Sequence, residues 1–157
     1  MERVVITIAR QYGSGGKTVG KMLANKLGIP WYSRDILKMA SEKSGISEQL
    51  FMQFDEKLRN SLFQRMTTNI YTGELIPPSS SDFVSAKNLF NYQAEVIKHL
   101  ADTQGCVIIG RAADFVLKDY PNVVSVFVHG SEEFNLARAM EQNSMTEDEM
   151  KKFIAKT

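Results

Sequence analysis

The hydrophobic positions of the chain alternate between short continuous runs and longer segments with helical spacing. Four runs are too short for buried helices and predict strands at about residues 3–9, 29–32, 106–110 and 123–129. Between and after them, hydrophobic residues recur every three or four positions, which predicts amphipathic helices. Strands that alternate with helices in this way indicate βαβ units, and therefore a three-layer α/β fold with a parallel sheet.

The predicted helices are bounded by residues that commonly begin or end helices. The first, Val19–Leu27, is followed by Gly28, a residue that favours helix termination. Ser81 is expected to cap a long helix that continues to Ala101, and Thr146–Glu149 has the pattern of a capping box for the last helix. The same spacing predicts further helices at about residues 36–40, 50–71, 111–118 and 131–141.

A glycine-rich turn joins the first predicted strand to the first predicted helix. It reads Arg10-Gln11-Tyr12-Gly13-Ser14-Gly15-Gly16-Lys17-Thr18. Backbone N–H groups of such a turn can surround phosphate oxygens, and the helix that follows adds the partial positive charge of its N-terminus. We therefore expect Lys17 to contact the β- and γ-phosphates of ATP and the Thr18 hydroxyl to bind Mg²⁺.

The turn departs from the standard pattern G-x-x-x-x-G-K-[ST] at its first position. Gln11 stands where that pattern has glycine, so only Gly16-Lys17-Thr18 fits strictly. A plain strand-to-helix turn without a ligand is the alternative, but the flanking strand and helix favour phosphate binding. The predicted phosphate-binding residues are Gly13, Ser14, Gly15, Gly16, Lys17 and Thr18.

Charged residues follow the predicted strands at their carboxyl ends, where open parallel sheets bind ligands. Arg10 follows the first strand, Arg34 and Asp35 the second, and Arg111 the third. Arginines at one edge repel one another unless an anion lies among them, and guanidinium groups hold phosphates in a fixed orientation. Asp35 could hold Mg²⁺, accept a proton, or only complement a helix dipole, while Arg111 could instead pair with Asp114 or another acid.

Composition limits the classes of protein to which the chain can belong. Its 157 residues, 43% hydrophobic and 24% charged, are typical of one globular domain. A net charge of +1 argues against a broad nucleic-acid surface, and the apolar runs are too short for a signal peptide or a membrane span. The single cysteine, Cys106, cannot form an intramolecular disulfide, so a cytoplasmic location is expected.

Three segments resemble the cytidylate kinase-like family of P-loop kinases. Val5–Lys17 resembles the opening of that family, including the residue other than glycine at position 11. Val107–Asp114 resembles its second signature, a strand followed by G-R-x-A-D, and Leu89–Ile97 is similar to its central helix. The resemblance implies a nucleoside monophosphate kinase fold and the transfer of a phosphoryl group from ATP to an acceptor such as CMP or dCMP.

The resemblance also implies roles for particular residues. Lys17 and Arg111 would be catalytic, with Arg111 on the acceptor phosphate and Asp114 close to it. Arg34 and Asp35 are predicted at the same acceptor end, with Asp35 as a second metal ligand beside Thr18. Arg138 would lie near the donor nucleotide, at the base of a lid.

The domain organisation follows from the same resemblance. We expect a single domain with a core at about 1–43 and 82–138, an acceptor-binding insertion at about 44–81, and the start of a lid at about 139–157. The insertion could instead be a helical hairpin that only packs. The family has further lid arginines and a final strand, so we expect Thr157 to fall inside the lid of a longer chain.

Two other functions remain open at this point. A nucleotide-binding regulatory module without turnover would keep the glycine-rich turn, and a small-molecule kinase could use the same fold with a different acceptor.

Overall fold

The computed structural model describes residues 3–59 and 73–156 of the chain. Their centre is a sheet of four parallel strands in the order β2-β3-β1-β4. The strands are β1 (Val5–Arg10), β2 (Trp31–Tyr32), β3 (Cys106–Ile109) and β4 (Val123–Val128). Because neighbouring strands are parallel, their carboxyl ends lie at one edge of the sheet. The predicted α/β class and the parallel sheet are confirmed.

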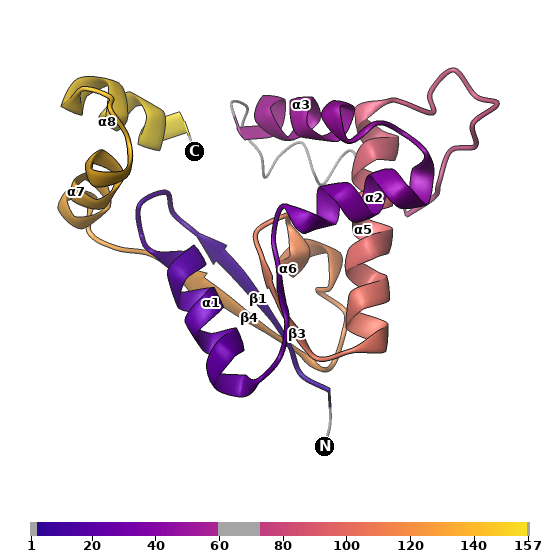
Figure 1. The fold of residues 1–157 in the computed structure, drawn as a ribbon, viewed down its shortest axis with the longest axis horizontal. Helices are drawn as coiled ribbons and strands as arrows, with labels where there is room; N and C mark the ends of the chain where they lie inside the picture. Colours follow the sequence, from indigo (N-terminus) through magenta and orange to yellow (C-terminus); the bar gives the residue numbers. More distant parts are fainter. Residues whose placement is uncertain (1–2, 60–72, 157) are drawn as a thin grey trace.

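Helices cover both faces of the sheet, which gives the expected three layers (Figure 1). On one face lies α1 (Gly16–Leu27), and on the other lie α5 (Ala86–Thr103) and the short α6 (Ala113–Val116). Every residue of β3 is buried. A strand covered on both faces needs hydrophobic side chains on both, which explains why the central strands read as continuous apolar runs.

The remaining helices lie beyond the carboxyl ends of the strands (Figure 1). On one side, α2 (Asp35–Ser44) packs against α5 and against α3 (Glu48–Arg59). On the other side, α7 (Glu132–Gln142) packs against α8 (Glu147–Lys156), near the turn between β1 and α1. The strand ends that carry the charged residues therefore lie between two pairs of helices.

Several predicted helix ends are confirmed by their hydrogen bonds. Gly28 ends α1 with a left-handed backbone, and its N–H donates to Ala24 and Asn25 carbonyl oxygens. The capping box of α8 is formed in both directions, since Thr146 N–H donates to Glu149 Oε2 at 3.0 Å and Glu149 N–H donates to Thr146 Oγ1 at 3.3 Å.

The predicted start of the long helix is wrong by four residues. Ser85, and not Ser81, caps α5, because its hydroxyl accepts a hydrogen bond from the N–H of Asn88 at 3.3 Å. Residues 81–84 form turns instead. The Asn88 side chain supports this arrangement, since its Nδ2 donates to the Phe83 carbonyl at 2.7 Å and holds the residue before the helix in place.

The predicted helix over residues 111–118 is also wrong, because only Ala113–Val116 is helical. Arg111 and Ala112 have φ angles of 61° and 53°, which a right-handed helix does not allow. Of the helix predicted over residues 50–71, α3 accounts for the part up to Arg59, and residues 60–72 lie outside the described part of the chain.

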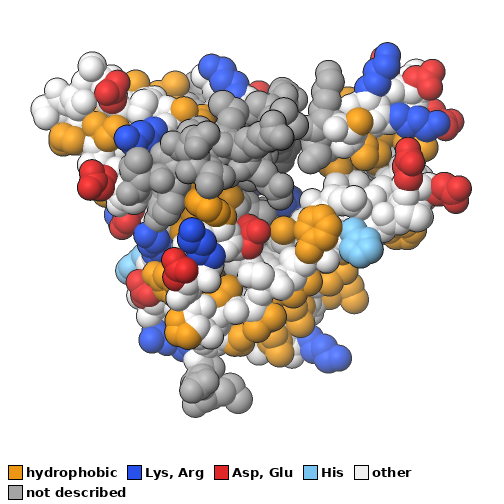
Figure 2. All heavy atoms as spheres, turned by 180° about the vertical axis from the view of Figure 1, so that it is seen from behind, with side chains coloured by type: hydrophobic (Ala, Val, Ile, Leu, Met, Phe, Trp, Pro, Cys, Tyr) orange, Lys and Arg blue, Asp and Glu red, His pale blue; other side chains and the backbone are white. Residues whose placement is uncertain are grey.

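β4 lies at one edge of the sheet and exposes hydrophobic side chains. Val124 and Phe127 are both more than half exposed, and Figure 2 shows hydrophobic side chains gathered on this side of the molecule. Within residues 3–59 and 73–156, no helix is long and apolar enough to cross a membrane.

Candidate active site

The glycine-rich turn between β1 and α1 is closed by a side chain of its own. Ser14 is buried, its hydroxyl donates to the Gln11 carbonyl oxygen at 2.7 Å, and its N–H donates to the same oxygen at 3.2 Å. Gly13 and Gly15 have φ angles of 80° and 83°, a region open to glycine at low cost. The turn leads directly into α1, whose first N–H groups have no acceptor within the helix and suit an anion.

Gln11, which breaks the standard pattern, fastens this turn to the start of α7. Its Oε1 accepts hydrogen bonds from Asn135 Nδ2 at 3.1 Å and from the N–H of Gly130 at 3.3 Å. Its backbone N–H donates to the Val128 carbonyl at 3.1 Å, so both its backbone and its side chain join the end of β4. A glycine at this position could not form the two hydrogen bonds of the Gln11 side chain.

The other residues of the turn also contact α7 and α8. The guanidinium carbon of Arg138 lies near Gly15, where an added Cβ would be 3.5 Å from it. Tyr12 packs edge-on against Phe153, with ring centroids 4.9 Å apart, and its hydroxyl accepts from Asn143 Nδ2 at 2.9 Å. The structure therefore places Arg138 beside the turn, and its role at the donor nucleotide stays a prediction.

Lys17 lies in a group of positive charges at the beginning of α1. Its pKa is lowered, first by partial burial and then by the charges of Lys21, Arg10 and Arg34, while the Asp35 carboxylate acts in the opposite direction. Positive side chains held this close repel one another, so a bound polyanion would be favoured by all of them. The side chains predicted from the ends of β1 and β2 are thus brought together around Lys17.

Arg10 connects the glycine-rich turn to the end of β3. A Cβ added to Gly16 would lie 2.5 Å from Arg10 Cβ, and one added to Gly110 would lie 2.5 Å from Arg10 Nη1. The side chain therefore extends from the turn to the residue just before Arg111. A larger residue at Gly16 would occupy the space of the arginine stem, whereas at Gly110 the left-handed φ angle of 75° favours glycine.

Arg111 is presented by an unusual stretch of backbone at the end of β3. Gly110, Arg111 and Ala112 have φ angles of 75°, 61° and 53°, so three consecutive residues are left-handed. For residues other than glycine this conformation carries strain, which proteins retain mainly at functional sites. The stretch turns the arginine side chain towards α3, where its Nη1 forms an ion pair with Asp55 Oδ1.

The alternative left open by the sequence, that Arg111 pairs with Asp114 or another acid, is confirmed in its second form, because Arg111 pairs with Asp55. Asp114 is exposed in the first turn of α6, whereas the side chains of Arg111 and Asp55 are only 7% and 14% exposed. Sequence reasoning missed Asp55 because it precedes Arg111 by 56 residues, and no local pattern marks the face of α3 on which it lies.

The predicted magnesium ligands, Thr18 and Asp35, lie in the first turns of α1 and α2 and carry side-chain oxygen atoms. Thr18 is exposed in the first turn of α1, and the Asp35 carboxylate is close enough to Lys17 to influence its pKa. Mg²⁺ typically takes one or two protein oxygens together with phosphate oxygens, and this pair fits that requirement. Within residues 3–59 and 73–156, no three or more His, Cys, Asp or Glu side chains are grouped as a metal site.

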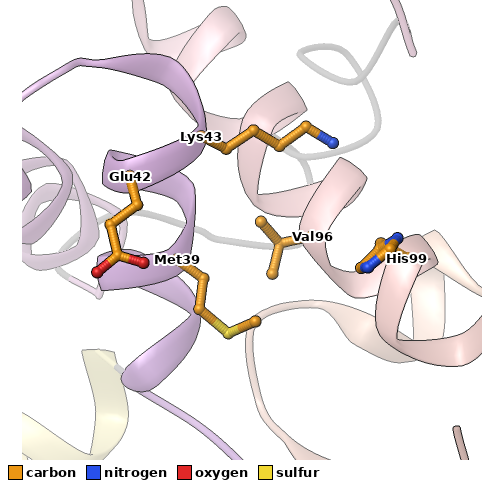
Figure 3. Close-up of a pocket in the computed structure, with 5 residues that line it drawn as sticks. All are labelled: Met39, Glu42, Lys43, Val96 and His99. Atoms are coloured by element: carbon orange, nitrogen blue, oxygen red, sulfur yellow. The ribbon is translucent and has the colours of Figure 1, made fainter. Parts of the chain in front are cut away.

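A separate hollow of about 360 Å³ lies between α2 and α5 (Figure 3). It is lined by Met39, Glu42 and Lys43 from α2 and by Val96 and His99 from α5. Lys43 extends towards α5, where its Nζ lies 3.9 Å from Glu95 Oε2. Glu42 points away from α5. None of the charged residues around Lys17 or Arg111 lines this hollow.

Comparisons with known proteins agree with the fold. A model of the cytidylate kinase-like family matches residues 5–157, and no curated protein matches the chain. An uncharacterized protein from Eubacterium ventriosum is 24% identical, with 98% of this chain and 70% of that chain covered and a TM-score of 0.63.

Two kinases of known structure share the fold at lower identity. Shikimate kinase from Bacteroides thetaiotaomicron is 17% identical (97% of this chain and 75% of that chain covered, TM-score 0.51). A gluconokinase from Sinorhizobium meliloti is 18% identical (99% and 76% covered, TM-score 0.51). These likenesses are evidence for the fold.

The contact between the turn and α7 predicts a large effect for Gly13→Ala. The new Cβ would clash with the backbone of Asn135, whose carbonyl carbon would lie at 2.9 Å. We expect the free energy of unfolding to fall by about 2–4 kcal/mol, from left-handed strain and overpacking together. Urea unfolding measures this loss, and hydrogen exchange should show faster opening of α7.

Gly45→Ala is the matched control, because Gly45 has a φ of 76° but nothing within 4 Å of an added Cβ. It should lose about 1–2 kcal/mol through strain alone. Equal losses in the two variants would contradict the proposed packing of the turn against α7.

Proposed function

We propose that this chain, which belongs to the cytidylate kinase-like family, transfers a phosphoryl group from ATP to a nucleoside monophosphate, with CMP or dCMP as the favoured acceptor. The observation that carries the proposal is the group of positive side chains around Lys17, next to a glycine-rich turn at the carboxyl edge of a parallel sheet. Membership of a kinase-like family and a fold shared with two kinases support phosphoryl transfer in general.

On the donor side, the turn from Gly13 to Thr18 binds the phosphates of ATP. Backbone N–H groups at the start of α1 and the Lys17 ammonium are directed at the β- and γ-phosphates. Arg138, beside Gly15, adds a further positive charge. Thr18 and Asp35 would hold Mg²⁺, which neutralises phosphate charge when bound.

On the acceptor side, Arg111 binds the phosphate of the nucleoside monophosphate. Arg10 lies between the turn and Gly110, so the chain provides positive charge continuously from the donor end to the acceptor end. Arg34 and Asp35 begin α2 at the same edge, and Asp114 lies two residues into α6. Phosphoryl transfer depends mainly on positioning and charge stabilisation, and these side chains supply both.

We assign the larger parts of the chain on the same basis. Residues 1–43 and 82–138 form the core that carries both anion sites, residues 44–81 contact the acceptor, and residues 139–157 begin a lid. The contacts of Tyr12 with Asn143 and Phe153 support the placement of the lid beside the donor site.

A kinase with a different small-molecule acceptor is the second candidate. The two solved kinases that share this fold are named for shikimate and gluconate, which are not nucleotides. The turn and Lys17 would serve this activity equally well, because they contact only the donor. The two candidate functions differ in the acceptor, which is proposed to bind at Arg111 and α3.

An acceptor panel distinguishes these activities. The protein is incubated with Mg²⁺ and ATP together with CMP, dCMP, AMP, UMP, shikimate or gluconate, and the ADP formed is measured. We expect turnover with CMP or dCMP above all others. Turnover only with shikimate or gluconate would favour the second candidate, and tight ATP binding without turnover on any acceptor would contradict a kinase function.

Lys17→Ala should weaken ATP binding by about 10- to 100-fold, because a charge-assisted contact to the phosphates is lost. Calorimetric titration with ATP measures this change. Lys26→Ala, in the last turn of the same helix, is the matched control and should bind ATP normally. The melting temperature of Lys17→Ala should not fall, since the substitution removes one member of a repelling group. Normal ATP affinity in this variant would remove Lys17 from the site.

A further inference from the structure

The guanidinium proposed to bind the acceptor phosphate already has an anionic partner within the chain. Arg111 Nη1 forms an ion pair with Asp55 Oδ1, and the two side chains are 7% and 14% exposed. Asp55 comes from α3, inside the segment proposed to contact the acceptor. A phosphate that binds Arg111 therefore meets a carboxylate at the same guanidinium.

The packing of α3 does not depend on this ion pair. Phe51 and Phe54, on the same helix, are 0% and 7% exposed and belong to the main hydrophobic core with residues of α2 and α5. Burial of large hydrophobic side chains such as these holds a helix in place. A buried ion pair gives little net stability by comparison, because the desolvation of both charges offsets their attraction. The need to hold α3 in place therefore does not by itself explain the Arg111–Asp55 pair.

The backbone at Arg111 indicates that the direction of its side chain matters. Arg111 and Ala112 both adopt left-handed φ angles without being glycine, a conformation that carries strain. The neighbouring Ala113 and Leu117 are fully buried and fix this conformation. The strained stretch thus holds the guanidinium in a preset place, and that place faces Asp55.

We infer that Asp55 determines which acceptors Arg111 admits, by acting as an internal anion that the acceptor must replace. The inference rests on the proposed function, because it takes Arg111 as the residue that binds the acceptor phosphate. A phosphate monoester carries a charge of about −1.5 to −2 at pH 7 and three acceptor oxygens. The carboxylate of an acceptor carries a charge of −1, the same as Asp55, and therefore has no advantage over Asp55 in binding Arg111. A neutral hydroxyl does not displace Asp55. The pair therefore lowers the affinity of Arg111 for every ligand by a common factor, so that phosphate acceptors still bind while the weaker sugar acids and neutral alcohols do not.

Binding to Arg111 can be followed separately from binding to the glycine-rich turn. In amide NMR titrations, Arg111 and Gly110 report on the acceptor end, and Lys17 and Gly16 report on the donor end. The probes are inorganic phosphate, CMP, cytidine and acetate, each added to the whole protein. In the unmodified protein we expect phosphate and CMP to shift the Arg111 signals, acetate to do so far more weakly, and cytidine to leave them unchanged.

Asp55→Asn keeps the size of the side chain and removes its charge. We expect this variant to bind phosphate and CMP at Arg111 about tenfold more tightly, and acetate by a similar factor, because the internal competitor is lost. Cytidine should bind as before. Asp55→Glu, which restores the charge, should return the affinities towards those of the unmodified protein.

Glu56→Gln is the matched control, since Glu56 is the next residue of α3 and is exposed. It removes the same charge and should change each affinity by less than about twofold. ATP binding at Lys17 should be the same in all variants.

Weaker phosphate binding in Asp55→Asn, with ATP binding unchanged, would overturn the inference, because Asp55 would then support Arg111 instead of competing with its ligand. If Asp55→Asn does not fold, the carboxyl ¹³C signal of Asp55 in the unmodified protein decides. It must change when phosphate binds at Arg111, and phosphate binding without such a change contradicts the inference. Inorganic phosphate that binds Arg111 more tightly in Asp55→Asn, while CMP does not bind, would leave the inference intact and refute the proposed acceptor.

Discussion

The constraint on which this molecule depends is the repulsion among positive charges at one edge of its sheet. Parallel pairing places the carboxyl ends of all four described strands at this edge, and the chain puts Arg10, Arg34 and Arg111 there. The charges of Arg10 and Arg34 act on Lys17. Water screens such charges incompletely at short range, so the arrangement is most favourable when anions lie among them. One anion is the chain's own Asp55, and the others are the phosphates of the proposed substrates.

Specific contacts join the glycine-rich turn and the end of β3 to each other and to the surrounding helices. Gln11 fastens the glycine-rich turn to the end of β4 and to α7, and Tyr12 fastens it to α8. Arg10 spans the space between the turn and Gly110, and the strained residues after Gly110 direct Arg111 to α3. A movement of α7 or α3 would therefore change the position of the glycine-rich turn or of Arg111 respectively, which suits the proposed two-substrate transfer.

How much of this could be predicted from the sequence depends on the range of the interactions involved. The strands and the glycine-rich turn could be predicted, because burial on both faces of a sheet and a strand-to-helix turn leave local patterns. The left-handed backbone at Arg111 left no such pattern, since hydrophobic spacing does not record φ angles, and a helix was predicted there. The partner of Arg111 could not be predicted either, because Asp55 reaches it only through the tertiary packing of α3. Gln11 was recognisable as a departure from a motif, but its role required the position of Asn135.

The central claim is that one site holds two phosphate groups in line between Lys17 and Arg111. An inhibitor that joins adenosine to cytidine through a polyphosphate chain tests it most directly, with its affinity measured by calorimetry and its contacts by amide NMR. We expect it to bind more tightly than ATP or CMP alone and to shift the signals of both Lys17 and Arg111. An affinity no greater than that of ATP, with the signals of Gly110 and Arg111 unchanged, would contradict a shared site.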